Sequence, residues 1–226
     1  MEFLCRDEDR GVIPDPVPAR TELPGWYRRL PGVDESALSV TNDGMTLKRC
    51  MPFLDAMTAG FLLPLAATVR LEVSDGGKVV EAGWEFDRTM VSNHGAFQVA
   101  GNPFEPRPPL KFHNYWTVRS APGWSCLFVP PLNRPNPVVE VLSGVVDTDR
   151  FSNEVNIPFM PVARDGIHVL ERGTPLVQVI PFRRVDLPSR AEIRPESKDE
   201  RDARVRTQRA IAAGSGWYRR HARARR

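Results

Sequence analysis

PVVEVLSGVVDTDRFSNEVNIPFMPVARDGIHVLERGTPLVQVIPF, residues 137–182, contains four short apolar runs separated by turn-forming residues. The runs are PVVEVLSGVV, EVNIPF, GIHVL and PLVQVIPF. They are rich in β-branched residues, and Gly, Asp, Asn and Pro stand between them. Helical periodicity is scarce. This stretch therefore predicts consecutive β-strands joined by short turns.

The same pattern extends upstream, so that strands are expected from Thr46 to Phe182. Further runs are ATVRLEV, KVVEAGWEF, YWTVR and SCLFV, with turn signals at 75–77, 121–123, 133–137 and 172–173. Short strands with proline-rich turns are typical of a sandwich, a jelly roll or a distorted barrel. The exception is MPFLDAMTAGFLL at 51–63, where the apolar positions fit either one face of a helix or a buried strand.

The two ends of the chain differ in composition from the middle. Prolines at 14, 16, 18, 24 and 31 predict an extended N-terminal segment, because each fixes φ and lacks a backbone donor. After Pro188, good helix formers mixed with both signs of charge predict a short helix and a tail. The predicted division is an N-terminal arm at 1–45, a β domain at 46–188 and a basic helical tail at 189–226.

Charge is unevenly distributed along the chain. The whole chain carries a formal charge of +3, but residues 189–226 hold twelve Arg and Lys against five Asp and Glu, a net charge of +7, which leaves −4 for the rest. A mildly acidic body with a basic tail is unlike a basic DNA-binding domain. Only the tail, with WYRRHARARR at its end, is suited to nonspecific contact with nucleic acid phosphates.

The sequence predicts a soluble, cytoplasmic protein. No stretch approaches the roughly 20 apolar residues of a membrane span, and the charged start MEFLCRDEDRG does not fit a signal peptide. Cys5, Cys50 and Cys126 are odd in number and lack a C-x-x-C pair. This spacing argues against a disulfide framework and against a thiolate zinc site.

Asp147 and Asp149 are the first candidates for chemistry. They follow an apolar run that ends at Gly144-Val-Val146, and two residues separated by one lie on the same face of an extended segment. Such a carboxylate pair activates water or holds a cation. The alternative is that both satisfy backbone groups in a turn between strands.

Four stretches together resemble the trimeric dUTPase and dCTP deaminase superfamily, and in the same order. GVVDTDRFSNEV at 144–155 is similar to its Gly-[Ile/Val]-[Ile/Val]-Asp-x-Asp-Tyr element, and RGTPLVQVI at 172–180 to its later Gly-x-x-[Ile/Leu]-x-Gln element. TAGFLLP at 58–64 and Arg119-Ser120 resemble its Ala-Gly-Tyr-Asp and Arg-Ser-Gly elements. The resemblance implies a β-clip fold over roughly residues 55–184.

The same resemblance implies a function and a set of site residues. It implies nucleotide or small-anion binding, with hydrolysis as a possible reaction, Mg²⁺ as its cofactor and a homotrimer whose sites lie between subunits. Asp147 is then the residue that orients water, and Asp149 supports it. The implied substrate-binding residues are Arg119, Ser120, Gln178 and Arg150, which stands where the family has its deoxyribose-stacking Tyr.

A second resemblance covers most of the chain. LKRCMPFLDAMTAGF and FHNYWTVRSAPGWSCLFVPPLNR are similar to segments of uncharacterised proteins of tailed phages and some bacteria. It implies a viral context, and hence the host cytoplasm. A non-catalytic structural or assembly protein whose basic tail contacts nucleic acid is therefore the alternative function.

The histidines define a third alternative. A non-haem iron oxygenase on a jelly roll requires two His and one carboxylate around Fe²⁺, and His94, His113 and Asp147 are the candidates. No H-x-[DE] or H-x-H spacing is present, however, so nothing in the sequence places two ligands on one strand. The other interpretation is that each His forms structural hydrogen bonds.

Overall fold

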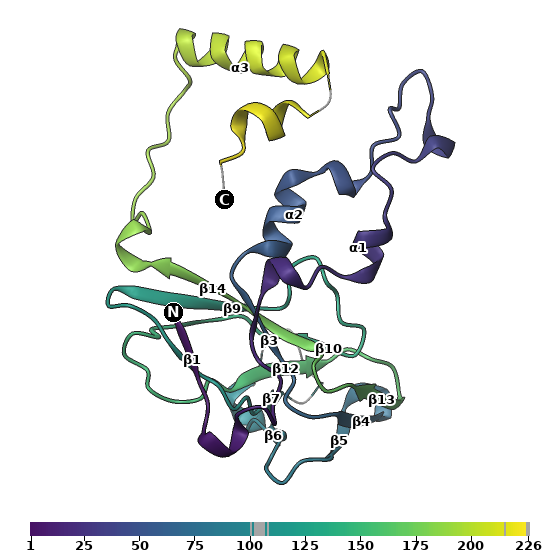
Figure 1. Ribbon diagram of the computed structural model, residues 1–226, viewed down its shortest axis with the longest axis vertical. Helices are drawn as coiled ribbons and strands as arrows, with labels where there is room; N and C mark the ends of the chain where they lie inside the picture. The colour runs from purple at the N-terminus through teal and green to yellow at the C-terminus, as the bar shows by residue number, and fades with distance from the viewer. Residues whose placement is uncertain (100, 102–106, 108, 215, 225–226) are drawn as a thin grey trace. The chain divides into compact units, whose positions relative to one another are not determined.

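A computed structural model describes residues 1–226 except 100, 102–106, 108, 215 and 225–226 (Figure 1). The chain forms two compact units. The first, which we call the β unit, comprises Met1–Leu23 and Met57–Asp186. The second, which we call the basic unit, comprises Pro24–Ala56 and Leu187–Arg226. The predicted division at residues 45 and 188 rests on composition alone and stays a prediction.

The β unit consists of antiparallel sheets (Figure 1). Its strands are β1 (Glu2–Leu4), β2 (Val17–Pro18), β3 (Phe61–Pro64), β4 (Val69–Ser74), β5 (Val79–Trp84), β6 (Val91–Asn93), β7 (Leu110–Phe112), β8 (Thr117–Arg119), β9 (Trp124–Val129), β10 (Val139–Val141), β11 (Gly144–Val146), β12 (Ile157–Pro161), β13 (Gly166–Leu170) and β14 (Pro175–Arg183). The sheet orders are β11-β9-β14-β3-β2, β10-β12-β7-β6, β13-β4-β5 and β1-β8.

The five-stranded sheet carries the candidate site at its β11 edge. Its central strand β14 pairs with β9 in a register that sets Val179 opposite Phe128 and Arg183 opposite Trp124. On the far side of β9, β11 pairs Val146 with Cys126. The end of β14, the start of β9 and the end of β11 therefore lie close together.

The core of the β unit follows the strand alternation. In β4, Val69, Leu71 and Val73 are buried and the residues between them are not, as the run ATVRLEV predicts. Between β7 and β12, the rings of Phe112 and Phe159 stack with centroids 4.0 Å apart. Large buried rings contribute the most apolar area, which explains why they lie at the centre of this core.

The ambiguous segment 51–63 forms both predicted alternatives, one after the other. It begins as helix α2 (Met51–Thr58) and continues as strand β3. Gly60 lies between them at φ +65°, a conformation that suits glycine. A Cβ at Gly60 would also collide with the Val179 carbonyl of β14, so glycine is needed for the helix to end beside that strand.

The proline-rich N-terminal segment contributes strands to the β unit. β1 pairs with β8, and β2 extends the five-stranded sheet at β3. The buried Asp9 is held by a bidentate ion pair with Arg88, and the indole of Trp116 donates a hydrogen bond of 3.2 Å to the Pro14 carbonyl. These contacts hold the N-terminal segment in place, and an extended arm over residues 1–45 stays a prediction.

The basic unit contains helices α1 (Gly25–Arg29) and α3 (Lys198–Ala212) and a single π-helical turn at Tyr218–Ala222. Trp26, Tyr27 and Phe53 pack as an aromatic cluster. The predicted C-terminal helix α3 begins at a capping box, in which Ser197 and Glu200 each bond the other's backbone N–H.

The mainly β class is confirmed and fits the predicted β-clip or jelly-roll-like fold. Within the described residues the sheets stay open, and none closes into a barrel. Over the same residues, no helix has the length and apolar character needed to cross a membrane.

Candidate functional site

Asp147 ends β11 in a turn rather than in an extended segment. Its backbone carbonyl accepts hydrogen bonds from the N–H groups of Arg150 and Phe151, both at 2.9 Å. The prediction of an extended segment is therefore wrong at Asp147. The reason is local, because these two bonds bend the chain directly after the strand. The carboxylates of Asp147 and Asp149 nevertheless lie close together, since both contact the same arginine.

Arg184, which directly follows β14, joins the turn to the start of β9. Its guanidinium forms a bidentate ion pair with Asp149, at 2.8 and 2.6 Å, and lies 3.4 Å from Oδ1 of Asp147. It also donates to the Trp124 carbonyl and to Oγ of Ser125, both at 3.0 Å. We call these five residues the Arg184 cluster. The cation that the carboxylate pair holds is thus a guanidinium.

The cluster sets the charge state of Asp149. Its hydrogen bonds with Arg184 hold the pKa of the Asp149 carboxyl far below its usual value, and the Gly123 N–H at 2.8 Å adds to this effect. The hydrogen bond with Asp149 raises the pKa of Arg184 in turn. Asp149 is therefore ionised at neutral pH and is occupied by structural partners.

Asp147 differs from Asp149 in exposure and in partners. Its side chain is 54% exposed, whereas that of Asp149 is 6% exposed. Oδ1 of Asp147 accepts a hydrogen bond of 2.6 Å from Ser125. Arg184 is already paired with both carboxylates. Asp147 and Asp149 therefore do not fit the predicted Mg²⁺ as a chelating pair, because a metal ion between them would be repelled by the positive guanidinium. Asp147 keeps an accessible carboxylate oriented by Ser125.

Thr148, in the same turn, connects this turn to Arg119 and Ser120. The Ser120 N–H donates to the Thr148 carbonyl at 3.2 Å, and their hydroxyls lie 2.7 Å apart. Thr148 is buried, and its hydroxyl also contacts Sγ of Cys126 at 3.2 Å. The structure therefore brings together two segments that the sequence separates by about 28 residues.

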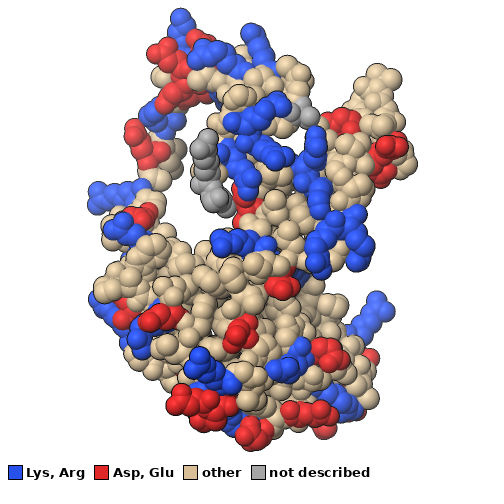
Figure 2. Space-filling view, viewed as in Figure 1, with Lys and Arg blue, Asp and Glu red and all other residues tan. Residues whose placement is uncertain are grey.

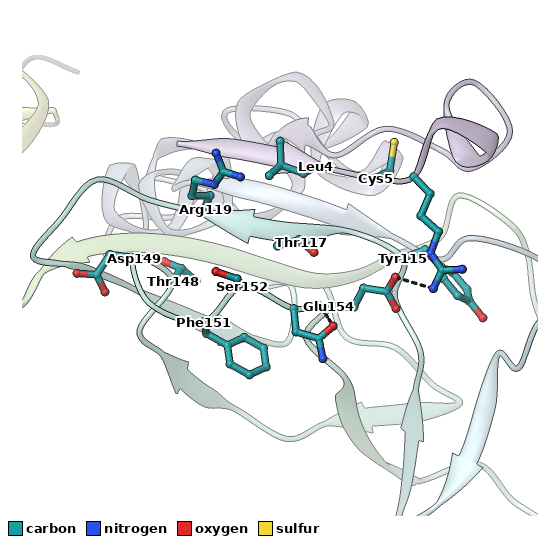
Figure 3. Close-up of a pocket in the computed structure, with 12 residues that line it drawn as sticks. Leu4, Cys5, Tyr115, Thr117, Arg119, Thr148, Asp149, Phe151, Ser152 and Glu154 are labelled. Carbon is teal, nitrogen blue, oxygen red and sulfur yellow. Dashed lines mark hydrogen bonds and ion pairs between the residues drawn. The ribbon is translucent and has the colours of Figure 1, made fainter.

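A groove of about 460 Å³ opens beside this junction (Figure 3). It is lined by Leu4, Cys5, Arg6, Tyr115, Thr117, Arg119, Thr148, Asp149, Phe151, Ser152, Asn153 and Glu154. Figure 3 shows Leu4 and Arg119 on one side, from β1 and β8, and Thr148, Ser152 and Phe151 on the other, from the turn that follows β11. The hydroxyl groups and the amide group among these residues can both donate and accept hydrogen bonds.

Two cations at the groove are held by weak ion pairs. Arg119 lies 3.4 Å from Glu2, and Arg6 lies 3.6 Å from Glu154. Both arginines are more than half exposed, and exposed pairs of this kind contribute about 0–1 kcal/mol. Arg119 and Arg6 are therefore available to an anion that displaces a glutamate.

The remaining predicted residues lie elsewhere. Asp147 and Arg150 line a neighbouring hollow of about 560 Å³, which shares Phe151, Asn153 and Glu154 with the groove. Ser120 uses its hydroxyl on Thr148 and on the Trp124 carbonyl. These side chains surround one turn from two sides rather than converging on one point.

Gln178 is fully buried in β14 and does not line the groove. Its side chain donates to the Ala59 carbonyl at 2.6 Å and accepts from the Leu132 N–H at 2.8 Å. It thereby connects two loops to the central strand of the sheet. This position gives Gln178 a stabilising role.

Gln178→Met is expected to lower the free energy of unfolding by about 2 to 4 kcal/mol, because the part-buried Ala59 carbonyl and Leu132 N–H each lose their partner at about 1–3 kcal/mol. Urea denaturation followed by circular dichroism measures the change. Gln98→Met is the control, because the hydrogen bonds of this exposed glutamine with Gly95 and His94 can be replaced by water, and the expected change is below about 0.5 kcal/mol. Equal stability of the two variants would contradict this role.

The two candidate iron ligands lie at opposite ends of β6. The backbone N–H of His94 donates a hydrogen bond to the Pro109 carbonyl, and the backbone N–H of His113 donates one to the Met90 carbonyl. Nδ1 of His94 lies 2.9 Å from Gln98, and Nε2 of His113 lies 2.7 Å from Ser92. The part of the chain that the structure describes contains no group of three or more His, Cys, Asp and Glu side chains able to hold a metal ion. The proposed set with Asp147 does not fit Fe²⁺.

Sequence reasoning missed Arg184, Arg6 and Glu2. Arg184 lies 35 residues from Asp149, and Glu2 lies 117 residues from Arg119. No motif identifies an arginine at the end of a strand, and charged residues near the N-terminus look the same whether or not they line a groove. Only the pairing of strands brings these residues to the site.

Comparisons with known proteins give a distant likeness to solved structures. No family model and no curated protein matches the chain. A solved structure similar to it is that of a mutant dUTPase from phage phi11 of S. aureus, at 11% identity and a TM-score of 0.35, with 62% of this chain and 85% of that chain covered.

Proposed function

We propose that the β unit binds a nucleotide or another small anionic metabolite in the groove so that it extends into the neighbouring hollow, where Asp147 orients water to hydrolyse it. The observation that carries the proposal is the hydrogen-bonded junction of Ser120 with Thr148, which sets the Arg119 segment beside the Asp147 turn. The groove, at about 460 Å³, is within the usual range of about 300–1,000 Å³ for ligand sites.

The groove offers each part of such a ligand a suitable partner. Arg119 is an exposed guanidinium, whose planar donors match phosphate oxygens. Phe151, 44% exposed, offers an aromatic face to a base or a sugar. Thr117 and Ser152 offer hydroxyls that both donate and accept. Glu2 competes with the anion for Arg119. Binding of the anion therefore requires that the weak Arg119–Glu2 ion pair be broken.

The hydrolytic step that we assign to Asp147 is general-base assistance. The carboxylate accepts a proton from a water molecule as the water oxygen bonds to phosphorus, and the bridging phosphorus–oxygen bond breaks, so that the leaving group departs with its electron pair. Ser125, at 2.6 Å, orients this carboxylate. The step needs only water and a phosphate ester or anhydride.

Binding is tested by thermal shift against nucleoside triphosphates, inorganic triphosphate, Mg²⁺, and Fe²⁺ with 2-oxoglutarate. A ligand at 100 times its Kd stabilises the native state by about 2.7 kcal/mol. We expect a shift with a triphosphate. A shift with Fe²⁺ and 2-oxoglutarate alone, or with none of these compounds, overturns the proposal.

Arg119→Ala is expected to weaken triphosphate binding about tenfold or more, as the loss of a charged hydrogen bond requires. Glu2→Gln is expected to tighten it by up to about fivefold, because the competing carboxylate is gone. Isothermal titration calorimetry measures both. Arg70→Ala removes an exposed arginine paired with Glu72 on β4 and is the matched control. If it weakens binding as much as Arg119→Ala, the groove is not the site.

A second function is favoured by charge, and it belongs to the basic unit. This unit carries a net charge of +7, and the β unit carries −4. Figure 2 shows many Lys and Arg over the basic unit, with fewer Asp and Glu among them. We propose that the basic unit contacts the phosphates of nucleic acid, in keeping with an assembly role. The predicted homotrimer and its cytoplasmic location stay predictions.

A further inference from the structure

The basic unit contains a hollow of about 570 Å³ of its own. One side is formed by residues of the segment 43–52, among them Arg49 and Met51, and the other by residues of the segment 211–219, among them Ile211, Trp217 and Arg219. All of these residues belong to one compact unit. Two segments that are distant in the sequence thus form a hollow lined by arginines, by aromatic rings and by one carboxylate, Asp43.

The arginines at this hollow are not engaged by carboxylates. Arg49 and Arg219 line it, and Arg220 follows Arg219 in the chain. All three are exposed, and among the described residues none of them forms an ion pair. Arginines in the first half of α3 differ, because Arg201 and Arg204 both pair with Glu196. Arg49, Arg219 and Arg220 therefore keep guanidinium groups that no carboxylate of the described residues pairs with, although Asp43 also lines the hollow.

Aromatic rings accompany these cations. Tyr218 lines the hollow and is 43% exposed. Trp217 also lines it and packs against the His221 ring, with centroids 5.5 Å apart. An exposed aromatic face beside arginines is the arrangement with which proteins stack the unpaired bases of a single strand while neutralising its phosphates. Duplex DNA does not offer such bases, because they are already stacked on one another.

The hollow is held in shape by an ion pair. The guanidinium of Arg223 pairs with the buried Asp55 of α2, at 3.1 and 2.6 Å. This bidentate contact fixes the π-helical turn Tyr218–Ala222 against the same helix that carries Met51. The C-terminal cations and rings are thus presented at a fixed place rather than on a free tail.

We infer that this hollow is a binding site for single-stranded nucleic acid, in which Tyr218 stacks on a base and Arg49, Arg219 and Arg220 contact phosphates. The inference rests on the proposed phosphate contact of the basic unit and adds a preference for single strands. The chemistry favours nucleic acid over an anionic membrane, because the ring lies beside the arginines inside a hollow rather than on one apolar face of a helix.

The test is fluorescence anisotropy of the full chain with a labelled oligothymidylate of about 15 nucleotides, a length near the upper end of single-strand site sizes. A duplex of the same length and vesicles containing an anionic lipid are the other probes. We expect tighter binding to the single strand than to the duplex. Tyr218→Ala should weaken single-strand binding about 5- to 150-fold, the loss of one stacked base, and Tyr218→Phe should not.

The arginines are tested by salt dependence. Arg219→Ala with Arg220→Ala should reduce the slope of log K against log salt for the single strand by about 1.4, since each phosphate contact contributes about 0.7. Arg201→Ala with Arg204→Ala changes the net charge equally but removes paired arginines, and its slope should stay near that of the unmodified chain.

The outcomes separate the inference from the proposal under it. Equal binding to duplex and single strand with no effect of Tyr218→Ala overturns the inference and leaves the phosphate contact standing. If the chain binds neither nucleic acid, the inference and the proposed phosphate contact are both overturned. If it binds the vesicles alone, both are likewise overturned, and a membrane surface is the partner. Equal loss in the two arginine double variants also overturns the inference, because net charge alone then explains binding.

Discussion

Asp147→Asn is expected to reduce any nucleotide hydrolysis by at least about 100-fold, the usual contribution of a general base. The substitution is nearly isosteric, and it removes the negative charge that accepts a proton from water. Since Asp147 is half exposed and its main side-chain contact is with Ser125, the melting temperature should change little. Phosphate release under saturating nucleotide measures the rate.

Asp149→Asn is the matched control for that experiment. It makes the same replacement of a carboxylate by an amide at the other member of the pair. The Asp149 side chain, however, is only 6% exposed and forms a bidentate ion pair with Arg184. We expect this variant to lose stability first and activity only as a consequence. Undiminished hydrolysis by the Asp147 variant would remove Asp147 from the reaction, whatever the control does.

Arg184→Met is expected to cause a large loss of stability at neutral pH. The thioether fills part of the space of the arginine stem, but the ionised Asp149 loses its guanidinium and the carbonyl of Trp124 loses a donor. A carboxylate left without its cation in a buried position is destabilising, and this cluster connects three strand ends. Thermal unfolding at pH 7 measures the loss.

The pH dependence of this loss follows from the depressed pKa of Asp149. A carboxyl whose pKa is lower in the folded than in the unfolded chain stabilises the fold above the unfolded value of about 3.8, and this stabilisation disappears as pH falls through the folded pKa. The difference between the unmodified chain and Arg184→Met should therefore be full at pH 5 to 7 and shrink as the pH falls below 3.8.

Arg183→Met is the control for the arginine. Arg183 is the neighbouring residue, it is half exposed, and its ion pair with Asp186 is long at 3.9 Å. It should have little effect at any pH. A difference between Arg184→Met and the unmodified chain that stays constant down to pH 2 would show that packing, not the ion pair with Asp149, explains the loss.

Local pattern was enough to predict the longer strands, but it missed the short strands β1, β2, β6 and β7 and could not give the pairing of any strand. The alternation of Val69, Leu71 and Val73 identifies β4 because burial on one face has a period of two residues, a property of the strand itself. The segment 51–63 was ambiguous because its apolar residues suit both structures, and what decides is the approach of the Val179 carbonyl to Gly60. That contact exists only in the folded sheet.

The candidate site was predictable only in part, for the same reason. The segment with Asp147 and the segment with Arg119 were both identified as functional candidates, and hydrogen bonds between Ser120 and Thr148 join them. Gln178 has the residue type of a binding side chain, but its burial in β14 was not visible in the sequence. Arg184 carries no motif, because its role depends on where β14 ends relative to β11.

The pairing of β1 with β8 has a consequence for how the groove arises in time. Glu2 and Arg119 are partners across 117 positions of chain, and closing so long a loop is entropically costly and slow relative to local turns. The turn at Asp147 forms from neighbouring residues. We therefore expect the turn to form early in folding and the β1 wall of the groove to be added late, so that ligand binding reports the last step of folding.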